Sequence, residues 1–501
     1  MSLSTSQTYG KWRQRLFPFE SFELKKMLPL ILIKFLASLN YCILTCLKSV
    51  LVVHSKGAGA EVIPVLKGWF VLPCAVIVTL LYSKLSNILK RTTLFYTFLG
   101  GFIFIVFLCG FILYPNMDLY SPNESADRLS VLLGGKFSHW VAVYRNWIPS
   151  LIFITAELWG SVIILLLFWG FANQITTVEE AKKSYTLYIV GGDLGTILVG
   201  PVIGLITNNL APSNFKLTVQ LLSIVLVLVG LLIAAIYFWT NKYVLTDKRF
   251  TFPQSIKKTE LPKKKPTLLQ SLNQIAKSKY LFHIAVIVIG YGLAVNIVEV
   301  TYLASLKNLY PNHNDYLSFY GTVLSIVGAT SLVVSLFFCS GIIRAAGWHF
   351  AAQISPVVIG VTGIGFFLLV MNQKALSPFF QHFGLNTLMV IVLFGAFQNI
   401  MSKVAKYSFF DPTKEMAYIP LDEEEKVKGK AAIDVVGSRL GKSGSSWIQV
   451  GLIDLLGTNS VLNITQFLLP IILVTVIFWS YSVKQLSKMF QGSKNPVSTS
   501  A

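Results

Sequence analysis

The sequence has 501 residues, of which 54% are hydrophobic and only 13% are charged. Soluble globular domains carry about 25% charged residues, so this composition excludes an ordinary soluble protein and indicates a polytopic protein in a lipid bilayer. The net charge of +20 is explained by basic loops that face anionic lipid. We predict no nucleic-acid partner, because no binding groove of basic and aromatic residues is evident.

Twelve hydrophobic segments are long enough to cross a bilayer, which takes about 20 apolar residues. They are 29–53, 65–83, 92–113, 144–171, 184–206 and 217–240, and then 280–304, 317–340, 351–371, 386–408, 432–456 and 462–484. The sequence therefore predicts an all-α membrane protein with twelve transmembrane helices. The first segment is too long for the core of a signal peptide, so we interpret it as a retained span.

A basic linker separates the two sets of six segments. Residues 241–279 contain ten Lys and Arg against Asp247 and Glu260. The positive-inside rule places this linker in the cytoplasm, and an even number of spans then places both termini there. Two six-helix halves joined in this way match the major-facilitator architecture, in which substrate binds near the midplane and the halves rock around it. The predicted parts are an N-terminal half (1–240), the linker (241–279), a C-terminal half (280–484) and a cytoplasmic tail (485–501).

Charged residues inside the predicted spans are candidates for function, because they are costly in a bilayer. In the first span, "LPLILIKFLASLNYCILTCLKSVLVV", Lys34, Tyr41 and Lys48 are spaced by seven and share one helix face. This face, with Asn40 beside it, is predicted to line a polar cavity. The alternative for Lys34 is that its amine reaches the cytoplasmic edge of the membrane.

The second to fifth spans add further charges. Glu61 and Lys67 flank an external turn and are predicted to form a structural gate pair. Arg145 and Glu157 fall in the fourth span, with Glu157 more than two turns deeper. Asp193 lies in a glycine-rich part of the fifth span, where it is either a functional carboxylate or a satisfied packing contact.

The C-terminal half carries its own set. Asn296 and Glu299 are three residues apart on the seventh span and are predicted to face the cavity, or alternatively to clamp two helices together. Lys403 and Lys406 end the tenth span and are interpreted as a basic cuff at the membrane edge. The eleventh span carries three more charged residues, Asp434, Arg439 and Lys442, of which Asp434 and Arg439 are expected to pair with each other or with a neighbouring helix.

The stretch "AAIDVVGSRLGKSGSS" (431–446) resembles a phosphate-binding loop of nucleotide hydrolases. That motif needs a glycine at 436, but Val436 stands there and Gly437 follows one residue late. The stretch also lies in a predicted span, and no extramembrane segment is long enough to build a hydrolase domain. We therefore interpret Lys442 as a point-charge phosphate binder that acts with other buried lysines on an anionic substrate.

Several longer stretches carry a resemblance to a known family. They are "LNYCILTCLKSVLVV", "GAGAEVIPVLKGW", "AELWGSVIILLLFWGFANQITT", "NIVEVTY" and "YSFFDPTKEMAYIPLDEEEKVKGKAAIDVVGSRLGKSG". The chain resembles the ATP/ADP translocase family of plastids and of obligate intracellular bacteria such as chlamydiae and rickettsiae, over almost its whole length. The resemblance implies a twelve-span major-facilitator fold and nucleotide exchange, typically of ATP for ADP. Some members are proton-coupled nucleotide importers or carriers of NAD.

The resemblance also implies roles for four charged residues. The functional lysines of the family match Lys48 and Lys442, and its acidic residues match Glu157 and Glu299. The sequence departs from the family at three places. This chain has Thr45 where members of the family often have Arg, and Ser49 where they often have Asp. It has Tyr302-Leu303 where they often have Trp-Lys. The loss of two cations motivates the hypothesis that NAD competes at least as well as ATP for the site.

We expect a transporter that exchanges adenine nucleotides (NAD, ADP or ATP) and imports host nucleotide through the inner membrane of an intracellular bacterium. A proton-coupled nucleoside triphosphate symporter is the alternative, with Glu157, Glu299 or Asp193 titrating. A membrane enzyme is disfavoured because no catalytic constellation of His, Asp and Glu is evident. No cofactor, metal site or obligatory protein partner is implied. The candidate substrate-binding residues are Asn40, Tyr41, Lys48, Arg145, Glu157, Asn296, Glu299 and Lys442.

Overall fold

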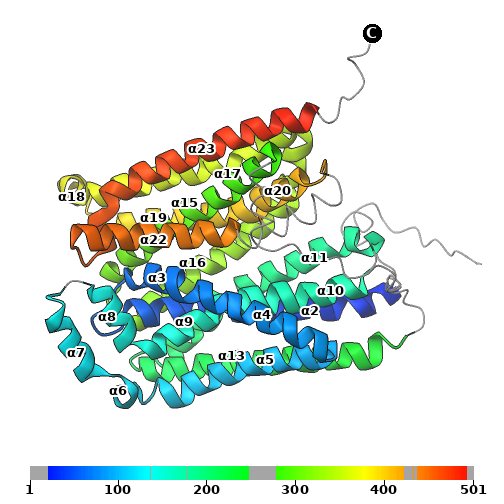
Figure 1. Ribbon diagram of the computed structural model, residues 1–501, viewed down its shortest axis with the longest axis horizontal. Coiled ribbons are helices and arrows are strands. Elements are labelled where there is room, and N and C mark those ends of the chain that lie inside the picture. Colours follow the sequence, from blue (N-terminus) through cyan, green and yellow to red (C-terminus); the bar gives the residue numbers. More distant parts are fainter. Residues whose placement is uncertain are drawn as a thin grey trace, which may run out of the picture.

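The computed structural model describes residues 21–135, 137–176, 178–247, 278–421, 433 and 437–492. Every regular element in these residues is helical, and several long helices contain a π-helical segment. Figure 1 shows the helices running roughly side by side along the long axis of the molecule. The predicted all-α class is confirmed. Most of the predicted linker, Asp434 and the end of the predicted tail lie outside the described residues.

The first six spans form what we call the N-terminal group, residues 21–247. Its helices are α2 (Ser21–Val53), α3, η1 and α4 (Val62–Val65, Leu66–Val71, Leu72–Ile88), α5 and η2 (Arg91–Leu108, Cys109–Leu113), α9, η3 and α10 (Trp147–Trp159, Gly160–Phe168, Trp169–Ile175), α11, α12 and η4 (Val178–Ile197, Val199–Gly204, Leu205–Leu210), and α13 and η5 (Phe215–Trp239, Thr240–Val244).

The remaining spans form the C-terminal group, residues 278–492. Its helices are α15 (Lys279–Leu309), α16 and η6 (His313–Val334, Ser335–Cys339), α17 (Ser340–Met371), α19, η7 and α20 (Thr387–Ala405, Lys406–Phe410, Asp411–Ala417), α22 (Ser438–Leu456), η9 (Val461–Ile464) and α23 (Thr465–Gly492). In Figure 1 most of this group occupies the upper part of the view and the N-terminal group the lower part.

Eleven helices among the described residues are long and apolar enough to cross a membrane, whereas the sequence predicts twelve. The remaining predicted span, 432–456, corresponds to α22. This helix has only 19 residues and carries Arg439, Lys442 and Asp454. It packs against α15 and against α3 and η1 of the other group, so its polar residues are placed beside protein rather than only beside lipid.

Short helices cover one end of the bundle. These are α6 (Met117–Tyr120), α7 (Asn123–Leu132), α8 (Ser138–Arg145) and, in the C-terminal group, α18 (Gln373–His382). They lie on the left in Figure 1, and we call this end the α7 end. The last turns of α23 and helix α10 lie at the opposite end, which we call the α10 end.

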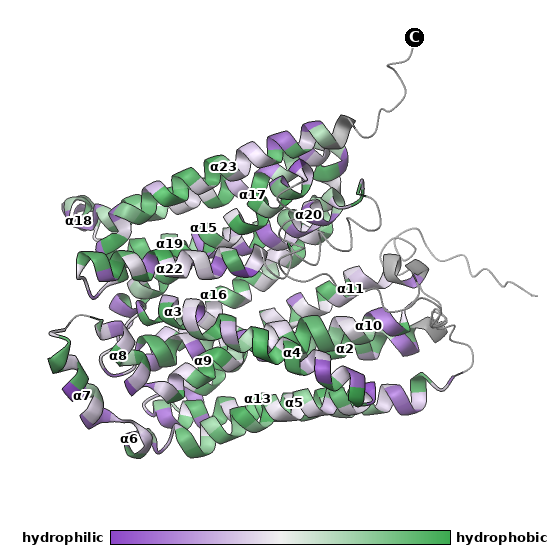
Figure 2. Cartoon of the chain, in the orientation of Figure 1, coloured by the Kyte–Doolittle hydropathy of each residue, from purple (hydrophilic) through white to green (hydrophobic). Residues whose placement is uncertain are grey.

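Several helices have an asparagine cap at their N-terminus, near the α7 end. The side chains of Asn214, Asn312 and Asn386 accept hydrogen bonds from the first backbone N–H groups of α13, α16 and α19. Such caps satisfy donors that have no partner within the helix. The outer surface is apolar instead, with large exposed side chains such as Leu231 on α13 and Phe478 on α23. Figure 2 shows hydrophobic residues along much of both helices, as a lipid-facing surface requires.

Several helix contacts join the two groups, among them the packing of α2 against α16. Helices α11 and α12 pack against α16, and α3 and η1 pack against α22. The Ser325 hydroxyl of α16 donates to the Ile197 carbonyl and accepts from the Gly200 amide, both at 2.7 Å. These contacts bring the charged residues of the second, seventh and eleventh predicted spans to the same place.

Candidate functional site

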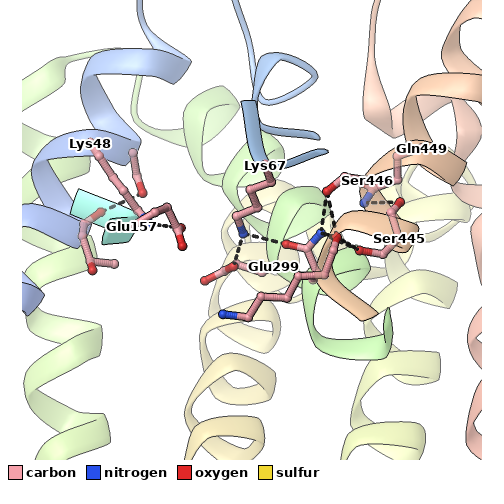
Figure 3. A network of polar contacts seen from close by, with 11 residues as sticks. Lys48, Lys67, Glu157, Glu299, Ser445, Ser446 and Gln449 are labelled. Carbon is pink, nitrogen blue, oxygen red and sulfur yellow. Dashed lines mark hydrogen bonds and ion pairs between the residues drawn. The ribbon is translucent and has the colours of Figure 1, made fainter. Parts of the chain in front are cut away.

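Lys67 links the two helix groups deep inside the molecule. Its ammonium lies 2.6 Å from Asn296 Oδ1 and 2.9 Å from Glu299 Oε2, both on α15. Lys67 is 9% exposed and Glu299 is 21% exposed, so the pair is largely removed from water. Figure 3 shows the two side chains pointing toward each other from separate helices. An N-terminal cation therefore neutralises a C-terminal carboxylate.

Asn296 extends this link to α22. Its amide nitrogen lies 2.6 Å from Ser445 Oγ and 3.2 Å from Ser446 Oγ. It also lies 3.3 Å from the backbone carbonyl of Lys442. Both serine hydroxyls donate to that same carbonyl. The network thus joins η1, α15 and α22, and the backbone of Lys442 lies beside the Asn296 side chain. Figure 3 shows Lys67, Glu299 and the serines of this network.

The backbone around Lys67 is π-helical, in the segment η1. Such segments interrupt the regular helix and often occur at functional sites. Gly68 follows, and a Cβ atom there would lie 2.9 Å from the Trp447 ring of α22. The Trp447 indole N–H donates to the Gly68 carbonyl at 3.3 Å. The absence of a side chain at Gly68 is what lets α22 approach closely enough for the network around Asn296 to form.

The second ion pair lies within the N-terminal group, where Lys48 of α2 binds Glu157 of α9. The Lys48 ammonium also lies 4.7 Å from the centroid of the Phe153 ring, a cation–π contact. The charged neighbours of Glu157 further include Lys67 and Lys442. One carboxylate is therefore surrounded by cations from both helix groups.

Lys442 is carried by a helix that packs unusually close to its neighbour. A Cβ atom at Gly441 would lie 2.7 Å from the Ile289 carbonyl of α15, and one at Gly292 would lie 3.1 Å from the Gly441 Cα. The Lys442 side chain is exposed, although Gly441 and Ser443 on either side are buried. Among the described residues no carboxylate lies within 4.0 Å of its ammonium. Lys442 therefore has a charge available for a ligand.

Two sequence-based placements need correction. Lys67 does not pair with Glu61, as we predicted, but with Glu299 in the other helix group. Glu61 lies near Lys307 instead, and its burial raises the pKa of its carboxyl. Arg145 lies in α8, before the fourth span begins at Trp147, and binds Asp127 of α7. The reason is that an irregular break at Asn146 separates α8 from α9, which no hydrophobic pattern announces.

The remaining candidates from the first span lie apart from each other. Asn40 is fully buried and donates to the Leu226 carbonyl of α13 at 2.9 Å, which is a helix-packing contact. The Tyr41 ring lies over Gly160 of η3, and Glu157 is among the charged groups near its hydroxyl. Tyr41 thus lies on the same side of α2 as the ion pairs, whereas Asn40 lies on the other.

The α7 end is held together by contacts between the groups. The Lys307 ammonium donates to the Ala58 carbonyl at 2.7 Å, and Ser138 Oγ donates to Asn459 Oδ1 at 2.9 Å. His139 Nε2 lies 3.1 Å from Asp454 Oδ1 without hydrogen-bond geometry. Burial lowers the pKa of His139, and the nearby Asp454 partly opposes this. These contacts link the two groups at this end of the molecule.

Sequence reasoning missed the serines of α22 and the true partner of Lys67. A lysine inside the apolar stretch "EVIPVLKGWF" was the available signal, because an unpaired cation at that depth needs a partner on another helix. In the part of the chain that the structure describes, no cluster of His, Cys, Asp and Glu has the arrangement of a metal site.

The fold and site together define the class of protein. The arrangement of helices is similar to the solved structure of a bacterial homologue of the iron transporter ferroportin in an inward-facing state. The TM-score is 0.59 at 13% sequence identity, with 94% of this chain and 100% of that chain covered. The protein has the all-α, major-facilitator-like fold of membrane transporters.

Sequence comparisons identify the family. The family model described as TLC ATP/ADP transporter matches residues 3–490. "ADP,ATP carrier protein 1" of Chlamydia pneumoniae is 41% identical over 498 residues, which cover 98% of this chain and 96% of that protein. The chloroplastic "ADP,ATP carrier protein 1" of Arabidopsis thaliana is also 41% identical, covering 96% and 76%. "ADP,ATP carrier protein 3" of Rickettsia bellii is 35% identical, covering 96% and 98%. The chain belongs to the TLC ATP/ADP transporter family.

Proposed function

We propose that this chain exchanges adenine nucleotides by alternating access, with ADP as one of the two substrates. The observation that carries the proposal is the buried charge cluster, in which cations of both helix groups surround Glu157 and Glu299. Family membership supports the same function, because the relatives from Chlamydia pneumoniae and Rickettsia bellii are named ADP,ATP carriers.

The charge balance of the cluster fits a polyanionic substrate. Among the described residues, the cluster and its electrostatic neighbours contain six cations and three carboxylates. The cations are Lys34, Lys48, Lys67, Lys403, Arg439 and Lys442, and the carboxylates are Glu157, Asp193 and Glu299. An excess of cations in a water-restricted site is stabilised by a negatively charged ligand, and lysines bind phosphate as point charges.

Phosphate binding would proceed by exchange of partners. Substrate phosphate oxygens compete with Glu157 for Lys48 and with Glu299 for Lys67, while Lys442 offers a cation that has no carboxylate partner within 4.0 Å among the described residues. Each lysine then exchanges a charge-assisted hydrogen bond to a carboxylate for one to a phosphate. The net free energy of breaking the ion pair during substrate binding is therefore smaller than the strength of either bond. Release of Lys67 from Glu299 would also remove a link between the two groups, which couples binding to rocking.

We infer the membrane orientation from the charge of the basic linker. The ten basic residues of 241–279 support a cytoplasmic linker, with both termini on the same side of a bacterial inner membrane. The α7 end, where polar contacts link the two groups, then faces outward. In this proposal the segments 1–240 and 280–484 rock as two units around the substrate, while the linker and the tail 485–501 stay in the cytoplasm.

NAD is the second candidate substrate. Thr45 and Leu303 stand where relatives often carry cations; both are buried, and the Thr45 hydroxyl donates to the Tyr41 carbonyl of its own helix. Neither side chain offers a charge to a terminal phosphate, which supports a dinucleotide with an internal diphosphate. A cation lost from a phosphate contact is expected to cost about ten-fold in affinity.

The test is uptake of labelled ADP into liposomes that contain the purified protein. The liposomes are loaded with ADP, ATP, NAD or no nucleotide, and unlabelled ADP, ATP, NAD and GTP serve as external competitors. Exchange predicts that uptake depends on internal nucleotide and survives a protonophore. Uptake into empty liposomes that collapses with the protonophore would instead indicate a proton symporter. Inhibition by ATP but not by NAD would show that NAD is not a substrate.

A further inference from the structure

Lys403 is a half-buried cation that the ion pairs described above do not use. It lies near the end of α19, and the sequence alone suggests a basic cuff at the membrane edge. The structure instead places its ammonium within electrostatic range of α2 in the other helix group. Its electrostatic neighbours are Glu299 of α15 together with Cys42, Cys46 and Lys48 of α2. Its ammonium also lies 5.9 Å from the centroid of the Tyr320 ring of α16.

The backbone context excludes two ordinary roles for this lysine. A lysine at a free helix C-terminus stabilises the helix dipole, but here the chain continues as helix through η7 and α20 to Ala417. A lysine that reaches the membrane edge would point toward lipid headgroups. Lys403 is only partly exposed, and its neighbours come from three other helices of the core.

Lys403 also lacks a carboxylate of its own. Within the described part of the chain, no Asp or Glu oxygen lies within 4.0 Å of its ammonium. The acidic group that acts on it, Glu299, is already bound by Lys67 at 2.9 Å. Lys406, one turn further along, differs in this respect because it pairs with Asp411 at 3.3 Å. Lys403 therefore contributes an uncompensated positive charge, whereas Lys406 does not.

We propose that Lys403 is a further substrate-binding residue, which contacts the phosphate groups of the nucleotide together with Lys48. The inference rests on the proposed function and adds a residue of the C-terminal group to the phosphate site. With Lys48 on α2 and Lys403 on α19, a single diphosphate draws together helices of both groups. The charge of Lys403, rather than its shape, is what the site uses.

The experiment compares Lys403→Gln, Lys403→Arg and the matched control Lys406→Gln in the full-length protein in lipid nanodiscs. The dissociation constants of ADP and adenosine are measured for each variant, and the thermal midpoint without ligand reports folding. We expect Lys403→Gln to weaken ADP binding about ten-fold, because a hydrogen bond to a charged group is lost. Adenosine, which has no phosphate, should bind as in the parent. Lys403→Arg should restore ADP affinity to within about three-fold.

Two outcomes overturn the inference. Parent-like ADP affinity of Lys403→Gln shows that the amine does not bind phosphate, and an equal loss in Lys406→Gln shows only a general effect of positive charge. Failure of the parent protein to bind ADP would overturn the proposed function itself, which makes the two failures distinguishable. If Lys403→Gln lowers the thermal midpoint, Lys403→Met takes its place, because it keeps the length and apolar stem of the side chain.

Discussion

The Lys67 ammonium of the N-terminal group lies 2.9 Å from the Glu299 carboxylate of the C-terminal group. Lys48 and Glu157, in contrast, pair within the N-terminal group alone. The two ion pairs therefore have different consequences when they open. Release of Lys48 changes only the binding surface, whereas release of Lys67 also frees one helix group from the other.

Removal of this link should favour opening at the α7 end. In Lys67→Gln the Glu299 carboxylate loses its charge partner. The loss of a hydrogen bond to a charged group should destabilise the linked arrangement of the two groups by about 1.5–3 kcal/mol. Spin labels at the exposed positions Arg128 of α7 and Lys374 of α18, in a variant without native cysteines, would report longer distances. The control Lys216→Gln changes an exposed lysine and should leave the distances unchanged. Identical distance distributions in Lys67→Gln and the parent contradict the link.

The pair Lys48–Glu157 should be required for transport, and exchanging the two residues should not restore it. Lys48→Gln and Glu157→Gln each leave one buried charge unpaired, and ADP uptake should fall more than about ten-fold. The double variant Lys48→Glu/Glu157→Lys restores an ion pair and with it the thermal midpoint. Its uptake should stay low, because the cation now projects from α9 instead of α2. Parent-like uptake by the exchanged pair would mean that the pair is structural only.

Lys442 should contribute directly to ADP affinity. No carboxylate among the described residues lies within 4.0 Å of its ammonium, so Lys442→Gln removes a charge without leaving a partner behind. We expect about a ten-fold higher dissociation constant for ADP with an unchanged thermal midpoint. The weaker binding should also depend less on ionic strength. Lys484→Gln, at an exposed position of α23, is the control. Unchanged ADP binding by the Lys442 variant would remove it from the site.

Close packing of α22 on α15 should depend on one glycine. In Gly441→Ala the new Cβ would meet the Ile289 carbonyl at 2.7 Å, a backbone atom that cannot move aside. Such overpacking costs about 1–3 kcal/mol, and the thermal midpoint should fall. Gly444→Ala, one turn further on the same helix, meets no atom within 4 Å and should be neutral or slightly stabilising. Equal midpoints for the two variants would argue against the close approach.

His139 should make the stability of the α7 end depend on pH. Burial lowers the pKa of His139 in the folded state, so the folded protein binds fewer protons there than the unfolded chain. Its contribution to stability is present above the ordinary histidine pKa of about 6.5 and is lost as the pH falls below that value. The thermal midpoint should therefore drop between pH 7.5 and 5.5, and His139→Asn should reduce the drop. A drop of the same size in both proteins would assign the effect to other groups.

Sequence alone determined the membrane class, the approximate position of the spans and the set of buried charges. It did so because a bilayer demands long apolar runs, against which Lys48, Glu157, Glu299 and Lys442 stand out individually. Stretches such as "FFDPTKEMAYIPL" also indicated the family, since a long and specific sequence is recognisable without knowledge of the tertiary structure.

Only the tertiary structure decided which charges pair. Glu61 lies six residues from Lys67, yet Lys67 binds Glu299, which is 232 residues away. The choice depends on a π-helical turn at Lys67 and on the close approach at Gly68, which together direct the side chain toward α15. The position of α22 was decided in the same way, because a helix with three charged residues is stable in the bundle only where other helices supply its partners. Distances between helices depend on packing, and spacing along one chain does not encode them directly.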